Sequence, residues 1–157
     1  MIRGHEVPPV VNAPVRRICG YVRTVVAGIE AYAFTGISFA QPPIGDLRYK
    51  KPQPVTPWGD NTFDGTKTPP SCIQVDVFLA RCFVWVPYGL QKSEDCLYLN
   101  VWTPTLSGST RLPVMAWLHG GEFQVGSAAM RLDDGANLAA LGKVVVVTIA
   151  YRCFFVV

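Results

Sequence analysis

The chain has 157 residues and a net charge of +3, and half of its residues are hydrophobic while 16% are charged. This composition can bury the core of about one domain and argues against a disordered tail. The positive charges are spread along the chain with no basic stripe interleaved with aromatic residues, which argues against nucleic-acid binding. The first residues, MIRGHEVPPVV, lack the apolar segment of a secretory signal peptide.

The cysteines and histidines show no metal-binding pattern. The five cysteines stand at positions 19, 72, 82, 96 and 153, so at least one thiol is unpaired within the chain. No C-x-x-C pair occurs, and we expect neither a metal site nor a cofactor. The apolar run 144–157 is interrupted by Arg152 and is shorter than the roughly 20 residues of a membrane span, so we expect a buried strand there.

The first half of the chain predicts short strands followed by a long loop. Residues 20–26 and 32–39 are rich in β-branched and aromatic residues, which is typical of strands. Residues 41–45 (QPPIG) predict a turn, because two prolines remove two backbone donors and fix φ. Residues 46–95 are rich in proline and glycine and predict a loop, and so long a loop fits a compact domain only if something pins it.

The second half predicts a strand–helix–strand unit. Residues 97–103 and 112–118 read as strands, and residues 133–141 read as a helix with Asp133 or Asp134 as its N-cap and Gly142 just after its last turn. Residues 144–151 form an apolar run typical of a strand covered on both faces in the centre of a parallel sheet. The predicted class is α/β, with a loop-wrapped β region before it.

Four segments in this order resemble the type-B carboxylesterase family, which includes the cholinesterases. They are residues 36–45 (GISFAQPPIG), 93–102 (SEDCLYLNVW), 117–123 (WLHGGEF), and the strand at 145–152 that ends in Ala-Tyr-Arg. The resemblance covers about residues 9 to 152. It implies the N-terminal part of an α/β-hydrolase fold, with a central, mostly parallel sheet preceded by a small β region and a loop-rich segment. It also implies hydrolysis of a small-molecule carboxylic ester.

By this resemblance the main-chain N–H groups of Gly121 and Glu122 form the oxyanion hole, and His119 and Gly120 shape the loop. Ester hydrolysis builds negative charge on the carbonyl oxygen, and each N–H donor aimed at it stabilises the transition state by about 3–4 kcal/mol. Glycines allow the close approach, and a third donor is expected from the residue after a catalytic serine. The alternative is that the two glycines only make a turn after a strand.

The roles of three further side chains of the candidate site, Glu122, Trp85 and Phe123, are left undecided by the sequence. Glu122 replaces the family's commoner third glycine, and its carboxylate either turns to solvent or a base, or orients a water. Trp85 lies where cholinesterases place a tryptophan that binds a quaternary ammonium by cation–π attraction, but it fits an ordinary packed aromatic better, because its spacing to Cys96 is one residue longer. Phe123 is a second candidate for substrate contact.

The resemblance also implies structural bonds around the long loop. It pairs Cys72 with Cys96 in a disulfide, which would contribute on the order of 3 kcal/mol, pin the loop, and indicate a secreted or extracellular protein. Two unrelated thiols are the alternative, and Cys82 competes for pairing. The resemblance further implies that Glu94 and Asp95 form buried salt bridges with Arg48 and Arg152.

The sequence holds no complete catalytic triad. No G-x-S-x-G elbow occurs, and Ser38 in GISFA is followed by Gln-Pro-Pro, which disfavours the helix that the elbow needs. Of the histidines, His5 lies in the N-terminal segment and His119 opens the glycine loop. We therefore expect residues 1–157 to be an incomplete domain, truncated before the nucleophile and inactive alone.

Two other readings remain beside a fragment of an esterase. One is a catalytically dead, cholinesterase-like adhesion protein with a protein partner, and the other is a non-functional truncated product. In each case a half-built sheet leaves an unpaired edge and an uncovered apolar face. We expect the run 144–157 to be exposed and the isolated chain to be unstable or to aggregate.

Overall fold

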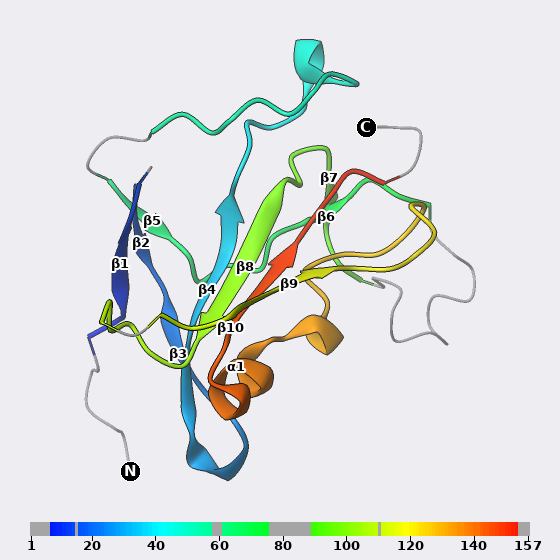
Figure 1. The fold of residues 1–157 in the computed structure, drawn as a ribbon. Helices are drawn as coiled ribbons and strands as arrows, with labels where there is room; N and C mark the ends of the chain where they lie inside the picture. The colour runs from blue at the N-terminus through cyan, green and yellow to red at the C-terminus, as the bar shows by residue number, and fades with distance from the viewer. Residues whose placement is uncertain (1–6, 15, 58–60, 76–88, 110, 154–157) are drawn as a thin grey trace.

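The computed structural model describes residues 7–14, 16–57, 61–75, 89–109 and 111–153. It contains one short α-helix and several strands joined by loops and 3-10 turns (Figure 1). The elements are β1 (Val10–Ala13), β2 (Arg16–Cys19), β3 (Tyr21–Thr24), η1 (Val26–Gly28), β4 (Glu30–Ser38), η2 (Gly45–Leu47), β5 (Thr62–Asp64), β6 (Ser71–Cys72), β7 (Lys92–Ser93), β8 (Tyr98–Thr103), β9 (Val114–Leu118), η4 (Arg131–Asp133), α1 (Ala136–Gly142) and β10 (Val145–Ile149).

The central sheet has five strands in the order β3-β4-β8-β10-β9. The β3–β4, β4–β8 and β8–β10 pairings are antiparallel, and the β10–β9 pairing is parallel. The predicted strand–helix–strand unit is confirmed, because β9, α1 and β10 follow one another and the two strands run in the same direction. This arrangement fits part of an α/β-hydrolase fold.

The expectation for residues 144–151 is only partly correct. The strand β10 lies inside the sheet, but it has one parallel and one antiparallel neighbour rather than two parallel ones. Its residues alternate between buried and half-buried positions, so one of its faces is covered more fully than the other. The expected exposure of this run is wrong for β10, because β9 and not β10 forms the edge of the described sheet.

The N-terminal β region and the long loop contain two smaller sheets. Strands β1, β2 and β5 form a three-stranded sheet, which brings the loop strand Thr62–Asp64 against the N-terminal hairpin. Strands β6 and β7 pair in parallel at the two ends of the segment that the disulfide closes. The predicted loop is therefore pinned at several points.

The helix α1 begins three residues later than the sequence predicts. Its N-cap is Gly135 and not Asp133 or Asp134, although the carboxylate of Asp134 accepts a hydrogen bond of 2.9 Å from the N–H of Ala136. Residues 131–133 form a 3-10 turn instead. At the other end Gly142 is still helical, and Lys143 takes the left-handed conformation with φ 52°.

The main core lies between α1 and one face of the central sheet. Small residues on the helix and on β4 allow close packing around the indole of Trp102 and the side chain of Val146. The buried members of this cluster are Ala31, Ala33, Trp102, Ala136, Ala139, Ala140 and Val146. Trp102 follows Val101 on β8, and because neighbouring residues of a strand face opposite sides, Val101 belongs to the other face.

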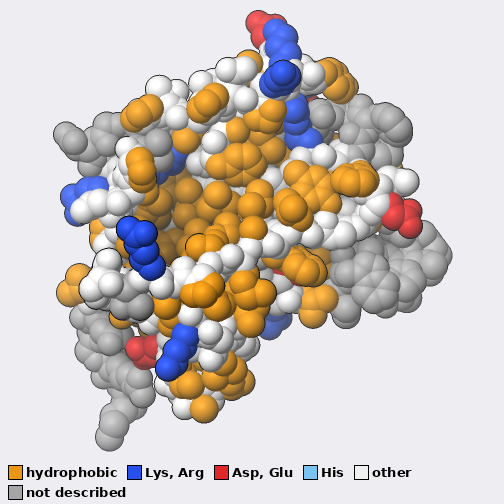
Figure 2. Space-filling model, in the orientation of Figure 1, with side chains coloured by type: hydrophobic (Ala, Val, Ile, Leu, Met, Phe, Trp, Pro, Cys, Tyr) orange, Lys and Arg blue, Asp and Glu red, His pale blue; other side chains and the backbone are white. Residues whose placement is uncertain are grey.

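That other face carries an open apolar hollow of about 500 Å³ between the sheet and the β1–β2 hairpin (Figure 2). Phe34, Leu99 and Val101 of the central sheet line it together with Ile18 of β2. The edge strand β9 is exposed along its whole length, with Val114 at 65% and Leu118 at 62% exposure. Apolar surface of this kind marks a missing layer or partner.

We predict that the isolated 157-residue chain self-associates through β9, because an exposed apolar edge strand offers unpaired N–H and C=O groups to a second chain. Val114→Lys should shift the protein toward monomer, since a lysine on an edge opposes strand pairing. Leu141→Lys is the matched control, because Leu141 is equally apolar and 55% exposed but lies on α1. Size-exclusion chromatography with light scattering measures the effect. A monomeric wild-type chain that melts cooperatively would contradict the prediction.

The predicted disulfide between Cys72 and Cys96 is confirmed. Both cysteines are buried and pack with Ala40 and Leu97 in a second hydrophobic cluster. Among the described cysteines, Cys19 and Cys153 are free. The competing residue Cys82 lies outside the described residues. The bond therefore ties β6 to the segment that leads into β8.

We predict that replacing both Cys72 and Cys96 by serine lowers the free energy of unfolding by about 3 kcal/mol, because the unfolded chain regains the entropy of the open loop. Urea denaturation of the double variant and the wild type gives the difference. Cys19→Ser serves as the control because Cys19 is not cross-linked. Equal stability of the double variant and the wild type would show that the cross-link contributes nothing.

Candidate active-site loop

The glycine loop follows the C-terminal end of β9 and has an unusual backbone. Gly121, Glu122 and Phe123 have φ values of 123°, 57° and 58°, so three consecutive residues take positive φ. Residues other than glycine rarely adopt this conformation, and each such residue costs on the order of 1–3 kcal/mol. Strain of this size persists only where surrounding contacts fix the loop.

Gly121 closes this turn on itself. Its carbonyl accepts hydrogen bonds from the N–H groups of Gln124 at 2.9 Å and Val125 at 3.0 Å. A β-carbon at position 121 would overlap the carbonyl oxygen of Val125, so only glycine fits there. At Gly120, in contrast, a β-carbon would meet no atom within 4 Å.

The N–H groups of Gly121 and Glu122 donate to no acceptor among the described residues. The β9–β10 pairing ends at Leu118 and Ile149, so these amides are not part of the sheet ladder. They remain available to an acceptor that the described residues do not supply.

His119 holds the start of the loop. Its side chain is buried and stacks on the ring of Tyr151, with 4.2 Å between the ring centroids and 11° between the planes. The Tyr151 hydroxyl donates a hydrogen bond to the carbonyl of His119. Tyr151 comes two residues after β10, so this contact fixes the loop to the neighbouring strand.

Two buried amide side chains hold the far end of the loop. Gln74 pairs with the main chain of Gly126 through two hydrogen bonds of 2.8 Å. Asn100 on β8 donates to the carbonyl of Ala128 and to the hydroxyl of Thr148 on β10, both at 2.9 Å. It also accepts a bond of 2.9 Å from the N–H of Gly36 on β4. The loop is thereby tied to three strands of the central sheet.

Two of the three residues considered for the substrate site, Glu122 and Phe123, are exposed at the surface. Glu122 is exposed to solvent, and no ion pair involves it among the described residues. Phe123 is 77% exposed and packs edge-on against Tyr151, with 6.1 Å between the centroids. Trp85 lies outside the described residues.

The predicted salt bridges differ from the expectation in burial and in partner. Arg48 and Glu94 form a two-bond ion pair, with distances of 2.9 and 2.6 Å, but 49% of the Arg48 side chain is exposed, so the pair is not buried. Arg152 instead donates to the carbonyl of Lys50 at 2.8 Å, and no ion pair with Asp95 is present among the described residues. Asp95 accepts a hydrogen bond from the hydroxyl of Tyr98.

The serine in GISFA does not occupy a strand-to-helix elbow. Ser38 is buried at the end of β4, where its hydroxyl accepts a hydrogen bond of 3.2 Å from Arg16. A strand residue buried in this way matches the sequence argument against an elbow. Within the described residues, no cluster of three or more His, Cys, Asp or Glu could hold a metal ion, and no helix is long and apolar enough to cross a membrane.

The sequence profile of the Carboxylesterase family matches residues 7–155. The chain belongs to this family. It is 46% identical to Carboxylesterase 1D of Rattus norvegicus over 156 residues and 44% identical to Liver carboxylesterase of Sus scrofa over 154 residues. It is 41% identical to Acetylcholinesterase-1 of Trittame loki over 147 residues. Each match covers 92% of this chain and 26% of the relative, so the chain spans about a quarter of the length of these relatives.

Two residues that hold the loop were not singled out from the sequence. Tyr151 stands within the Ala-Tyr-Arg segment that carries part of the resemblance, so its position was visible but its contact with His119 was not. Gln74 follows Cys72 by two residues in the proline-rich region, where no periodic pattern marks a buried side chain. A buried glutamine in a loop is found only from the three-dimensional contacts.

We predict that Tyr98 ionises only at an unusually high pH. Burial has the largest effect, followed by the hydrogen bond to Asp95 and the negative charge of Asp95, and together they raise the pKa of Tyr98 to about 12. The folded pKa exceeds the ordinary value of 10, so Tyr98 contributes stability that is lost as the pH rises from about 10 to 12. The ultraviolet absorbance of tyrosinate after a rapid pH jump measures this, and Tyr98→Phe should remove the latest step. Asp95→Asn should lower this pKa without returning it to 10, because burial remains. Ionisation of all the tyrosines near pH 10 would disprove it.

Proposed function

We propose that the full-length protein carrying this chain is a serine-type carboxylic-ester hydrolase, and that this chain supplies two of its oxyanion donors. The observation that carries the proposal is the pair of N–H groups at Gly121 and Glu122, which have no acceptor among the described residues and lie in a clamped, strained loop. Preorganised donors of this kind suit an oxygen that gains negative charge during acyl transfer. Membership of the Carboxylesterase family supports the same reaction.

The remaining catalytic groups would come from chain beyond residue 157. Attack on an ester needs a nucleophile and a general base, and within α/β-hydrolases the serine elbow and the histidine follow the glycine loop in the chain. We propose that residues 1–157 are the first part of one domain and that they do not turn over substrate alone. The chain spans 26% of its relatives, which fits this proposal.

The exposed strand β9 suits the addition of further parallel strands. Its inner edge already pairs in parallel with β10, while its outer edge has no partner among the described strands. A strand placed there would end beside the glycine loop, because the carboxyl ends of parallel strands meet at one edge of the sheet. We therefore propose that the complete sheet is mostly parallel and that its next strand leads to the nucleophile.

The substrate is proposed to be a small-molecule carboxylic ester, and the protein is proposed to be secreted or extracellular. The Cys72–Cys96 disulfide supports an oxidising compartment, since such bonds persist there. Phe123 and Trp85 remain candidates for substrate contact. The exposed carboxylate of Glu122 supports the reading in which this side chain turns to solvent.

We predict that Gly121→Ala lowers kcat/KM of the full-length protein for a chromogenic ester at least about 100-fold, since a misplaced oxyanion donor costs a factor of that order. The added methyl group would overlap the Val125 carbonyl and force the turn to rearrange. Gly108→Ala is the matched control, because Gly108 lies outside the glycine loop and a β-carbon there meets no atom within 4 Å. It should retain activity within a few-fold.

Two outcomes would defeat the proposed function. A full-length wild-type protein with no ester turnover would favour the adhesion or the truncated-product reading instead. A Gly121→Ala variant as active as the Gly108→Ala variant and the wild type would show that the amides at 121 and 122 do not contact the reacting oxygen. Circular dichroism of both variants establishes that the folded protein is being compared.

A further inference from the structure

The side chain of Gln74 is buried, with 6% exposure, and all of its polar atoms are paired. Its Nε2 donates to the carbonyl oxygens of Gly126 at 2.8 Å and Cys72 at 3.1 Å. Its Oε1 accepts a bond of 2.8 Å from the N–H of Gly126. One side chain therefore satisfies both main-chain polar groups of Gly126, as a paired strand would do.

Gly126 lies directly against the start of the glycine loop. Its φ is 122°, and a β-carbon there would overlap the imidazole of His119 and the carbonyl oxygen of Gly120. The two ends of the loop, residues 119–120 and 126, are thus in contact. Contacts that hold Gly126 in place therefore also hold His119 and Gly120, which directly precede Gly121 and Glu122.

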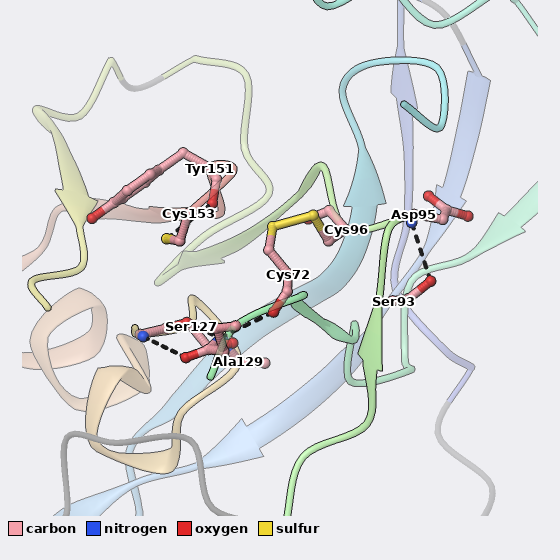
Figure 3. Close-up of a disulfide and its surroundings, with 10 residues drawn as sticks. Cys72, Ser93, Asp95, Cys96, Ser127, Ala129, Tyr151 and Cys153 are labelled. Carbon is pink, nitrogen blue, oxygen red and sulfur yellow. Dashed lines mark hydrogen bonds between the residues drawn. A yellow bond between two sulfur atoms is a disulfide. The ribbon is translucent and has the colours of Figure 1, made fainter. Parts of the chain in front are cut away.

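The disulfide-linked segment fixes Gln74 in turn. Cys72 is bonded to Cys96, and its carbonyl accepts one of the Gln74 hydrogen bonds. Lys92 on β7 donates to the carbonyl of Gln74 at 3.2 Å. Figure 3 shows the disulfide with Ser127, the residue after Gly126, on the Cys72 side. A continuous set of covalent and hydrogen bonds therefore runs from the disulfide to the loop.

We infer that Gln74 is a positioning residue for the oxyanion donors, acting through Gly126. This inference rests on the proposed function of the loop. Gln74 touches neither the reacting atoms nor the two donor amides. Its removal leaves the N–H and the carbonyl of Gly126 buried without partners, which is costly enough to make the loop move toward water. The donors then lose their fixed direction, while the central sheet keeps its own pairing.

The test uses the full-length protein and two variants, Gln74→Leu and Gln74→Glu. The leucine variant removes all three hydrogen bonds. The glutamate variant keeps the size and the acceptor for the Gly126 N–H, but it places a carboxylate oxygen against two carbonyls, so it provides a second disruption if the first variant fails to fold. Gln91→Leu and Gln91→Glu are the matched controls, because Gln91 is exposed and only its main-chain carbonyl takes part in its described hydrogen bond, which it accepts from the N–H of Ser71.

Hydrogen exchange of the paired amides of Gln124, Val125 and Gly126 is the first readout. We expect exchange at least about tenfold faster in the Gln74 variants than in the Gln91 variants, with the β4, β8 and β10 amides unchanged within about twofold. Ester turnover is the second readout. We expect kcat to fall at least about tenfold while KM stays within about threefold, because the lost interaction belongs to the transition state.

Unchanged exchange in the loop would overturn the inference, and so would faster exchange spread evenly over the sheet, since that indicates a general loss of stability. Loosened loop amides with unchanged kcat would overturn it as well. A wild-type protein without ester turnover would defeat the proposed function of the loop, and exchange would still decide whether Gln74 positions it. The two failures are therefore distinguishable.

Discussion

The structure around the glycine loop depends on the close approach of the Val125 carbonyl to Gly121, on the side where any other residue would carry its β-carbon. No side chain fits between these groups, so the chain can turn sharply only with glycine at this position. The turn forces Glu122 and Phe123 into the left-handed region, where residues of their type are rare. It also leaves the N–H groups at 121 and 122 outside every described hydrogen bond. The strain at Glu122 and Phe123 and the availability of two donors thus have one geometric cause.

Such a turn needs support, and the support comes from residues far apart in the sequence. Tyr151 holds the first residue of the loop through a ring stack and a hydrogen bond, and Gln74 holds the last. Asn100 connects the following residues to the sheet. The contacts of Gln74 and Asn100 are buried, that of Tyr151 is part-buried, and strained backbone persists where such contacts fix it. The disulfide enters the same network through the carbonyl of Cys72, so the loop-rich segment contributes to the site without touching a substrate.

Much of the fold could be predicted from local patterns. Runs of β-branched and aromatic residues located the longer strands, and the order of strand, helix and strand predicted the parallel β9–β10 pair. The direction of the other strands could not be predicted, because the pattern of apolar residues is the same in a parallel and an antiparallel strand. β8, for example, pairs antiparallel with β10. The helix start was misplaced, because Asp134 accepts a bond from Ala136 without occupying the N-cap.

At the site, the glycines and cysteines were visible as motifs. Gln74 was not, because its role depends on contacts with residues about fifty positions later in the chain.

The exposed strand and the unpaired amides lie at the same edge of the described sheet. β9 presents Val114 and Leu118 to solvent, and the glycine loop begins at the residue after Leu118. An apolar edge strand pairs with other chains unless another strand covers it. The two free N–H groups of the strained loop act as donors only if an acceptor reaches them. A further strand along β9 would meet both conditions at once, because it would bury the edge and end beside Gly121 and Glu122. One added strand would therefore serve both the sheet edge and the candidate oxyanion hole.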